Sequence, residues 1–169
     1  MSHPNSLNEL TEAVVSGSRY ADVSLDLIHW VCEREIPKGR KIKESVRAVR
    51  SKLHQVAGAY LEHTPDYMDW ITELGGIPHH MSDLTLQEFC RRKMACHAST
   101  QERLPFLEEF YARIFTQLPP VQSILDLACG FNPMALPWMP IGHGAVYYAC
   151  DIYQGMTDFL DFDIITLMQ

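Results

Sequence analysis

One short segment constrains the fold of this chain more than any other, a strand-like run that ends in a glycine turn. Residues 123–127, Ser-Ile-Leu-Asp-Leu, are mostly apolar, and a turn over residues 128–130 follows and ends in Gly130. Residues 132–133, Asn-Pro, then begin a helix-like stretch. A strand, a glycine turn and a helix form the first unit of a nucleotide-binding α/β sheet, and glycine leaves no Cβ between the backbone and a ligand.

A second strand-like run follows at the spacing that such a sheet needs. Residues 144–151 are largely apolar and end in Asp151, about 20 residues beyond the glycine turn, where these folds hold ribose hydroxyl groups. Only Gly130 is present where a dinucleotide-binding turn has three glycines, and Asp126 stands four positions before it. This pattern favours S-adenosylmethionine, which has an adenosine but no phosphate. An ordinary strand-turn-helix corner is the alternative.

Three separated stretches carry a resemblance to one family. They are residues 53–60 (LHQVAGAY), residues 97–104 (HASTQERL) with 107–111 (LEEFY), and residues 127–139 (LACGFNPMALPWM). In this order they are similar to the aminoglycoside-resistance 16S rRNA methyltransferases, which methylate N7 of a guanosine in the ribosomal decoding site. The resemblance extends over most of the chain, from about residue 19 to residue 155.

The resemblance implies an α+α/β fold. An N-terminal all-helical domain would be followed by the first strands of a Rossmann-like sheet of the kind found in S-adenosylmethionine-dependent methyltransferases. We expect residues 1–104 to form the helical domain that docks on the ribosome and its rRNA, and residues 105–169 to begin the cofactor-binding domain. Family members continue beyond the point that matches Gln169, so we expect an incomplete sheet, as in a truncated product, a crystallised fragment or a chain with a frameshifted end.

The resemblance also implies a site for S-adenosyl-L-methionine. Arg103 resembles the family arginine that pairs with the cofactor carboxylate, with Gly130 beside the methionine part and Asp151 at the ribose. The residues expected at this site are Arg103, Ala128, Gly130, Asp151, Ile152 and His97. The alternative for Arg103 is an ion pair with a neighbouring glutamate (Glu102, Glu108 or Glu109), and for His97 it is a purely structural role.

No catalytic acid, base or nucleophile is expected. N7 of guanine carries its own lone pair and no proton, so positioning and desolvation would drive the methyl transfer. Asp126 is expected to orient the turn rather than to touch the ligand, and Cys129 to be a buried thiol rather than a nucleophile. No metal site is expected, because Cys90, Cys96 and His97 lack the paired spacing of a zinc site.

The charge of the chain is strongly uneven. The net charge is −7, yet eight basic residues lie between Arg34 and Lys52, opposed only by Glu35 and Glu44. A concentrated basic element on an acidic chain is typical of a protein that binds phosphates with one surface, and a solvated helix face is the alternative. The residues expected to contact 16S rRNA in the 30S subunit are Lys38, Arg40, Lys41, Lys43, Arg47, Arg50 and Lys52.

Apolar residues recur at helical spacing through most of the chain before residue 118. The expected helices cover residues 7–15, 19–35, 41–61, 66–74, 85–98 and 100–117. No apolar run reaches the length of a membrane span, no signal peptide is visible, and the five cysteines fit free thiols in a reducing compartment. We therefore expect a cytoplasmic protein without a membrane partner, and the sequence leaves its oligomeric state open.

Overall fold

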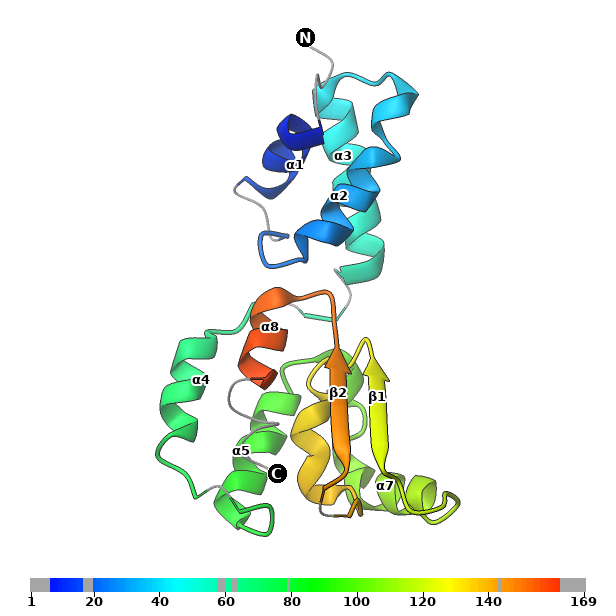
Figure 1. The fold of residues 1–169 in the computed structure, drawn as a ribbon. Helices are drawn as coiled ribbons and strands as arrows, with labels where there is room; N and C mark the ends of the chain where they lie inside the picture. Colours follow the sequence, from blue (N-terminus) through cyan, green and yellow to red (C-terminus); the bar gives the residue numbers. More distant parts are fainter. Residues whose placement is uncertain are drawn as a thin grey trace. The chain divides into compact units, whose positions relative to one another are not determined.

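A computed structural model describes residues 7–16, 20–57, 60–61, 64–78, 80–142 and 144–161 of the chain (Figure 1). The residues divide into two compact units. The first unit consists of residues 1–64 with 152–154, and the second of residues 65–151 with 155–169.

The described residues of the first unit form three helices whose apolar faces pack together. They are α1 (Leu7–Val15), α2 (Leu25–Glu33) and α3 (Ile42–Ala57), with the 3-10 turn η1 (Ile36–Lys38) between α2 and α3. The side chains buried in this core include Leu10, Val14, Ile28, Val31, Val49 and Leu53. The periodic apolar spacing predicted these three helices because each has one face against the other two.

Helix α2 is shorter than the predicted helix over residues 19–35. Val23 forms an antiparallel bridge with Tyr153, and the Ser24 N–H donates to the Ile152 carbonyl oxygen at 2.7 Å. These extended residues place Ser24 at the N-cap, so the helix begins at Leu25. Residue 19, the first of the predicted helix, lies outside the described part of the chain.

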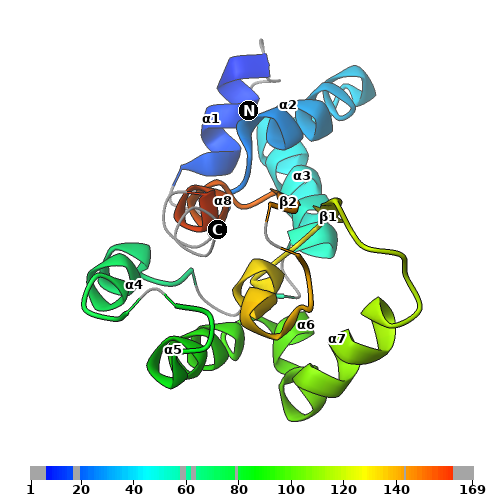
Figure 2. The ribbon, with the colours of Figure 1, turned by 60° about the horizontal axis from the view of Figure 1, so that its bottom comes forward.

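The second unit combines short helices with two strands. In chain order they are α4 (Tyr67–Leu74), α5 (Leu84–Met94), α6 (Ala98–Gln101), η2 (Leu104–Phe106), α7 (Leu107–Phe115), β1 (Ser123–Leu127), η3 (Asn132–Trp138), β2 (Val146–Cys150) and α8 (Gln154–Phe159), whose first residue belongs to the first unit (Figure 2). Asp66 begins α4 as an N-cap and accepts from the Met68 and Asp69 N–H groups at 3.1 and 3.2 Å.

Two of the predicted helices are interrupted. His97 is extended and divides the predicted helix over residues 85–98 into α5 and the start of α6. Pro105 falls in η2 and separates α6 from α7 within the predicted helix over residues 100–117. The helix-like stretch after the glycine turn is the 3-10 helix η3, which contains Pro137. Proline removes a backbone donor, which explains the short elements in the last two cases.

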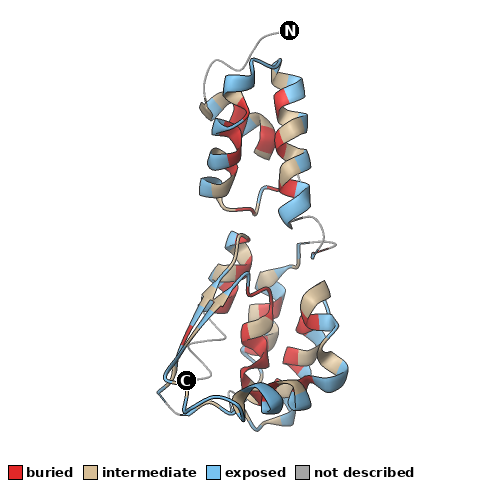
Figure 3. Ribbon diagram, turned by 90° about the vertical axis from the view of Figure 1, so that its right-hand side faces the viewer, coloured by how far each residue is buried: buried red, intermediate tan, exposed pale blue. Residues whose placement is uncertain are grey.

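β1 and β2 form a parallel pair in which Ser123 lies opposite Val146 and Leu127 lies opposite Cys150. Tyr147 points to the buried side, whereas Leu127 and Tyr148 on the other side are 70% and 56% exposed. Figure 3 shows the two strands as the border of the second unit, with its helices to one side. Parallel sheets are normally covered on both faces, whereas the described residues cover only one face of this pair.

The packing divides the chain near residue 64, whereas the sequence suggested a boundary after residue 104. Trp70 of α4 packs against Phe131, with 5.2 Å between ring centroids, and against Phe159 at 5.5 Å. Residues 65–104 therefore share a core with the segment that follows β1. Among the described helices, none combines the length and the apolar character that a membrane span requires.

Candidate functional site

The turn after β1 has a strained backbone that is held by the end of β2. Ala128 and Gly130 both have positive φ angles, 54° and 52°. The Gly130 N–H donates to Asp151 Oδ2 at 2.8 Å, and the Cys129 N–H donates to the Cys150 carbonyl oxygen at 3.1 Å. Such conformations cost about 1–2 kcal/mol for a residue other than glycine and gather at ligand sites. Three predicted cofactor residues, Ala128, Gly130 and Asp151, thus lie together.

His97 packs directly against Gly130. A Cβ built on Gly130 would lie 2.7 Å from His97 Cε1 and 3.0 Å from both ring nitrogens, so no larger residue fits here. His97 Nδ1 lies 2.9 Å from Ser99 Oγ, and its ring meets Phe131 edge-on at 5.8 Å between centroids. Burial lowers the pKa of His97, although Asp151 opposes this, so the ring is neutral near pH 7. These contacts give His97 a structural role at the turn, and its contact with the cofactor stays a prediction.

Arg103 has a buried donor that lacks a described acceptor. Its Nε atom is buried and has no hydrogen-bond partner among the described residues, and its guanidinium carbon lies 5.6 Å from the Phe110 ring centroid. In the part of the chain that the structure describes, no ion pair joins Arg103 to a neighbouring glutamate. Glu108 instead pairs with Arg91, with 3.6 Å between Glu108 Oε1 and Arg91 Nη2. Because buried donors are normally satisfied, a cofactor carboxylate fits this position.

A partly buried polar network supports the turn from the side of the sheet. Asn132 Nδ2 donates to Asp126 Oδ2 at 2.6 Å, the Tyr147 hydroxyl donates to the same oxygen at 2.5 Å, and the Tyr111 hydroxyl donates to Asn132 Oδ1. Burial raises the pKa of Tyr111 to about 12 and raises that of Tyr147 further, with Asp126 adding to the Tyr147 shift. Both hydroxyls therefore remain donors, and Asp126 orients the turn.

Sequence reasoning missed three members of this network. Tyr111 belongs to the LEEFY stretch and Asn132 precedes Pro133. Nothing in the sequence around either residue predicts that it lies in the same network as Asp126. Tyr147 follows Val146 in the second strand and is distinguished from Tyr148 only by the strand alternation. The one available signal was a polar residue on the buried face of each strand.

The cysteine within the turn is not activated. Cys129 is buried, and burial, reinforced by Asp151 and Asp126, raises the pKa of its thiol to about 12. A protonated, buried thiol is a poor nucleophile, which agrees with the structural interpretation. Within the described residues, no group of three or more His, Cys, Asp or Glu side chains is arranged to hold a metal ion.

Ile152, the remaining predicted cofactor residue, belongs to the first unit. Its carbonyl oxygen accepts from the Ser24 N–H in the extended segment described above. A contact between Ile152 and the cofactor stays a prediction.

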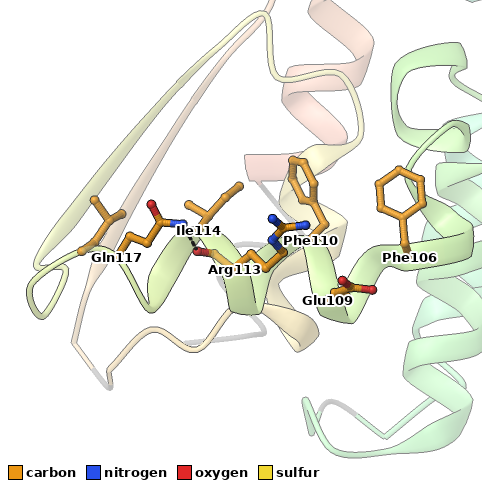
Figure 4. A pocket seen from close by; sticks show the side chains of 7 residues that line it. Phe106, Glu109, Phe110, Arg113, Ile114 and Gln117 are labelled. Carbon is orange, nitrogen blue, oxygen red and sulfur yellow. Dashed lines mark hydrogen bonds between the residues drawn. The ribbon is translucent and has the colours of Figure 1, made fainter.

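A hollow of about 650 Å³ lies along α7 (Figure 4). None of the predicted cofactor residues lines it, although Arg103 lies over the ring of Phe110, one of its wall residues. Its walls are mostly apolar, and Gln117 Nε2 donates to the Arg113 carbonyl oxygen at 3.1 Å along one of them. The lining residues are Phe106, Glu109, Phe110, Arg113, Ile114, Gln117 and Leu118. We do not assign this hollow to the cofactor.

The seven basic residues predicted to bind rRNA fall into three groups. Lys38, Arg40 and Lys52 each pair with the buried carboxylate of Glu35. Arg50 contacts backbone carbonyl groups at the end of α1. The third group is exposed and makes no ion pair with a described residue, and it consists of Lys41, Lys43 and Arg47.

Arg50 has a structural role that the sequence did not reveal. Its Nη2 donates to the carbonyl oxygens of Val14, Ala13 and Ser16 at 2.9, 3.2 and 3.2 Å, and its Nε donates to Val14 at 3.1 Å. A cation here satisfies the unpaired carbonyls at the C-terminal end of α1. An additional contact with rRNA stays a prediction for this residue.

Comparison with known proteins gives one consistent family. Residues 16–168 match the family model described as ribosomal RNA methyltransferase (FmrO). Relatives named 16S rRNA (guanine(1405)-N(7))-methyltransferase include one from Micromonospora rosea, 32% identical over 91% of this chain, and one from Frankia casuarinae, 33% identical over 95%. The match covers 57% of the length of each relative, so the chain spans little more than half of them.

Solved structures agree with this comparison. The 16S rRNA methylase RmtB matches with a TM-score of 0.71 and 28% identity, over 94% of this chain and 59% of RmtB. The 16S rRNA methyltransferase RmtF, solved in complex with S-adenosyl-L-homocysteine, matches with a TM-score of 0.67 and 26% identity, over 94% of this chain and 58% of RmtF.

Proposed function

Because this chain belongs to the ribosomal RNA methyltransferase (FmrO) family, we propose that it serves in the transfer of a methyl group from S-adenosylmethionine to N7 of a decoding-site guanine in 16S rRNA. The basic surface of the first unit docks on the 30S subunit, in the cytoplasm, and the turn of the second unit holds part of the cofactor. The product would protect the ribosome from aminoglycosides that contact this guanine.

One observation carries the cofactor assignment, the meeting of Gly130, Asp151 and the end of β1 in a turn with two positive φ angles. Parallel α/β sheets bind ligands at the carboxyl ends of their strands, and this turn lies there. The buried Nε of Arg103 offers a second contact, to the carboxylate of the methionine part. Asp151 would accept from ribose hydroxyl groups while one of its oxygens also holds the Gly130 N–H.

The methyl transfer requires no acid or base among the side chains of the protein. S-adenosylmethionine, when bound, supplies a sulfonium methyl group to the lone pair of guanine N7, which bears no proton. The chain therefore contributes orientation and exclusion of water rather than an acid or a base. The guanine is expected to leave its stack to reach the site, as for other enzymes that modify bases.

The described residues leave this site open. Leu127 immediately precedes the turn and is 70% exposed, so the neighbouring sheet face is in contact with water. An open site hydrates and misorients the methyl donor, and orientation supplies much of the rate. We therefore expect the 169 residues alone to bind S-adenosylmethionine weakly or not at all, and to confer no aminoglycoside resistance.

Calorimetric titration with S-adenosylmethionine and with S-adenosylhomocysteine tests the cofactor assignment. Any heat of binding should disappear in Arg103→Met and Asp151→Asn and persist in Glu102→Gln, a matched surface change beside Arg103. Binding that survives both site variants would remove Arg103 and Asp151 from the site. Tight binding with normal methylation of small subunits would contradict the expected inactivity of these residues by themselves.

A second function is favoured by the exposed sheet face together with the compact first unit. In this alternative, the chain binds the small subunit without methylating it. Mapping modified nucleotides in 16S rRNA after incubation with the chain distinguishes the two, because only the methyltransferase leaves 7-methylguanine. A modified nucleotide at another position would instead indicate a methyltransferase with a different RNA target.

A further inference from the structure

Glu35 is a fully buried carboxylate among three cations in the first unit. Its side chain is 0% exposed, and its Oε1 lies 2.6 Å from both Lys38 Nζ and Lys52 Nζ. Its Oε2 lies 2.6 Å from Arg40 Nη1. We refer to Glu35, Lys38, Arg40 and Lys52 as the Glu35 cluster. An ionised carboxylate is buried at low cost only when cations and hydrogen bonds surround it in this way.

The local fold explains how three cations reach one carboxylate. The η1 turn follows Glu35 directly, with Pro37 at its start and Gly39 in the left-handed conformation at its end, φ 63°. This tight turn reverses the chain, so that the side chains of Lys38 and Arg40 both contact Glu35 from the loop that follows it. The third cation, Lys52, comes from α3. Burial raises the pKa of Glu35, but the hydrogen bonds from Lys38 and Lys52 outweigh it and hold this pKa below the usual value.

The cations of the cluster remain accessible from outside. The side chains of Lys38, Arg40 and Lys52 are 43%, 43% and 41% exposed. Three positive charges face one negative charge, so the cluster keeps an excess of positive charge at the surface. A guanidinium group offers donors in a fixed planar fork that matches phosphate oxygens.

A shallow hollow of about 390 Å³ adjoins the cluster and shares Arg40 with it. Arg47 and Ser51 of α3 add a second guanidinium and a hydroxyl donor to its wall, and Ala48 adds a small apolar side chain. Glu44 also lines the hollow, and it is exposed and forms no ion pair with a described residue. The hollow thus has hydrogen-bond donors on two sides, Arg40 on one and Arg47 with Ser51 on the other. Of these, Arg40 is held in place by Glu35.

We propose that Glu35 is a positioning residue for RNA binding, and that its buried carboxylate fixes Arg40 as one wall of a phosphate-binding notch completed by Arg47 and Ser51. This inference rests on the proposed docking to 16S rRNA and deepens it. Fixing a long side chain before binding reduces the conformational entropy lost on binding, so a negative charge here increases the affinity for a negatively charged ligand.

The two glutamates give opposite expectations, which makes the inference testable. If the basic residues acted only through net charge, removing either negative charge would tighten binding to RNA. Glu44→Gln should do this, because Glu44 lines the notch and holds no cation. Glu35→Gln should weaken binding to small ribosomal subunits by about fivefold or more, because it releases three ordered cations.

The experiment measures cosedimentation of the whole chain with purified small subunits from an aminoglycoside-susceptible bacterium, over a series of salt concentrations. Circular dichroism and thermal unfolding verify that each variant is folded. Weaker binding of Glu35→Gln with tighter binding of Glu44→Gln supports the inference. Equal or tighter binding of a folded Glu35→Gln overturns it and leaves the docking itself intact.

A second variant keeps the test decisive if Glu35→Gln does not fold. Arg40→Lys retains the charge on a half-exposed side chain but loses the planar fork, so binding should also weaken. Unchanged affinity of Arg40→Lys would overturn the notch. A parent chain that does not bind small subunits would overturn both the notch and the docking, whereas the cofactor titration would still test the methyltransferase assignment.

Discussion

The two functional regions of this chain are held in place by different kinds of interaction. The Glu35 cluster depends on charged side chains that converge on one buried carboxylate. The turn at Gly130 depends on backbone conformation, on a hydrogen bond to Asp151 and on close packing against His97. A single side-chain charge should therefore matter most in the first region, and a single Cβ should matter most in the second.

The largest effect is expected from adding a methyl group at the turn. Gly130→Ala combines an unfavourable positive φ with a Cβ within 3.0 Å of all three nearest His97 ring atoms, so the free energy of unfolding should fall by about 2–4 kcal/mol. Gly39→Ala is the matched control, because Gly39 has φ 63° but no atom within 4 Å of its added Cβ. It should cost only about 1 kcal/mol.

Urea unfolding of both glycine variants, followed by tryptophan fluorescence, provides the comparison. Equal costs for Gly130→Ala and Gly39→Ala would mean that backbone strain alone matters, and that His97 yields to the added methyl group.

The next effect separates two arginines in one helix. Arg50→Ala removes charged donors from the carbonyl groups of Val14 and its neighbours, and should lower the stability of the first unit by about 1.5–3 kcal/mol. Arg47→Ala should change stability by less than about 0.5 kcal/mol, because Arg47 is exposed. Thermal unfolding measures both. Similar stability of the two variants would show that the Arg50 hydrogen bonds contribute nothing net.

A smaller effect on the free energy of unfolding is expected from a change in the polar network around Asp126. Tyr147→Phe removes a hydroxyl that donates to Asp126, and should cost about 1 kcal/mol. Tyr148→Phe, the next residue on the exposed face, should cost about 0 kcal/mol. The difference in denaturation midpoint between these two variants measures the network. A Tyr147→Phe variant as stable as Tyr148→Phe would contradict its role in supporting the turn.

The smallest expected effect is a difference in reactivity between the buried and the exposed cysteines. Burial raises the pKa of Cys129 to about 12, so almost no thiolate is present at pH 8. Exposed Cys96 and Cys150 should be alkylated by iodoacetamide at this pH while Cys129 remains unmodified. Mass spectrometry of peptides from the folded chain gives the order of reaction. Rapid modification of Cys129 would show that the turn opens.

The sequence predicted the turn better than the basic surface, for a physical reason. The strand at 123–127, Gly130 and Asp151 follow one another along the chain at a spacing typical of this kind of turn. This spacing is enough to predict the turn. Glu35 was visible only as one acid among many basic residues, because its burial depends on the η1 turn and on Lys52 from a different helix. Long-range side-chain contacts of this kind leave no local pattern.

The boundary between units shows the same limit. Apolar spacing predicted α4 and α5 but not the core to which they belong. The contact of Trp70 with Phe131 joins α4 to the segment after β1, across a long stretch of chain. The Arg50 contact with Val14 is similar, since a basic residue on a helix is equally compatible with phosphate binding and with capping a neighbouring helix.

We propose that the basic surface of the first unit docks on the small subunit where related methyltransferases act. The most direct test adds increasing amounts of this chain to a methylation reaction that contains small subunits, excess S-adenosylmethionine and the Serratia marcescens relative, which is 29% identical to this chain. We expect the chain to inhibit methylation, the inhibition to decrease at high salt, and the double change Lys43→Glu with Arg47→Glu to abolish it. Undiminished methylation at saturating concentrations of the folded chain would contradict docking of the basic surface at this position.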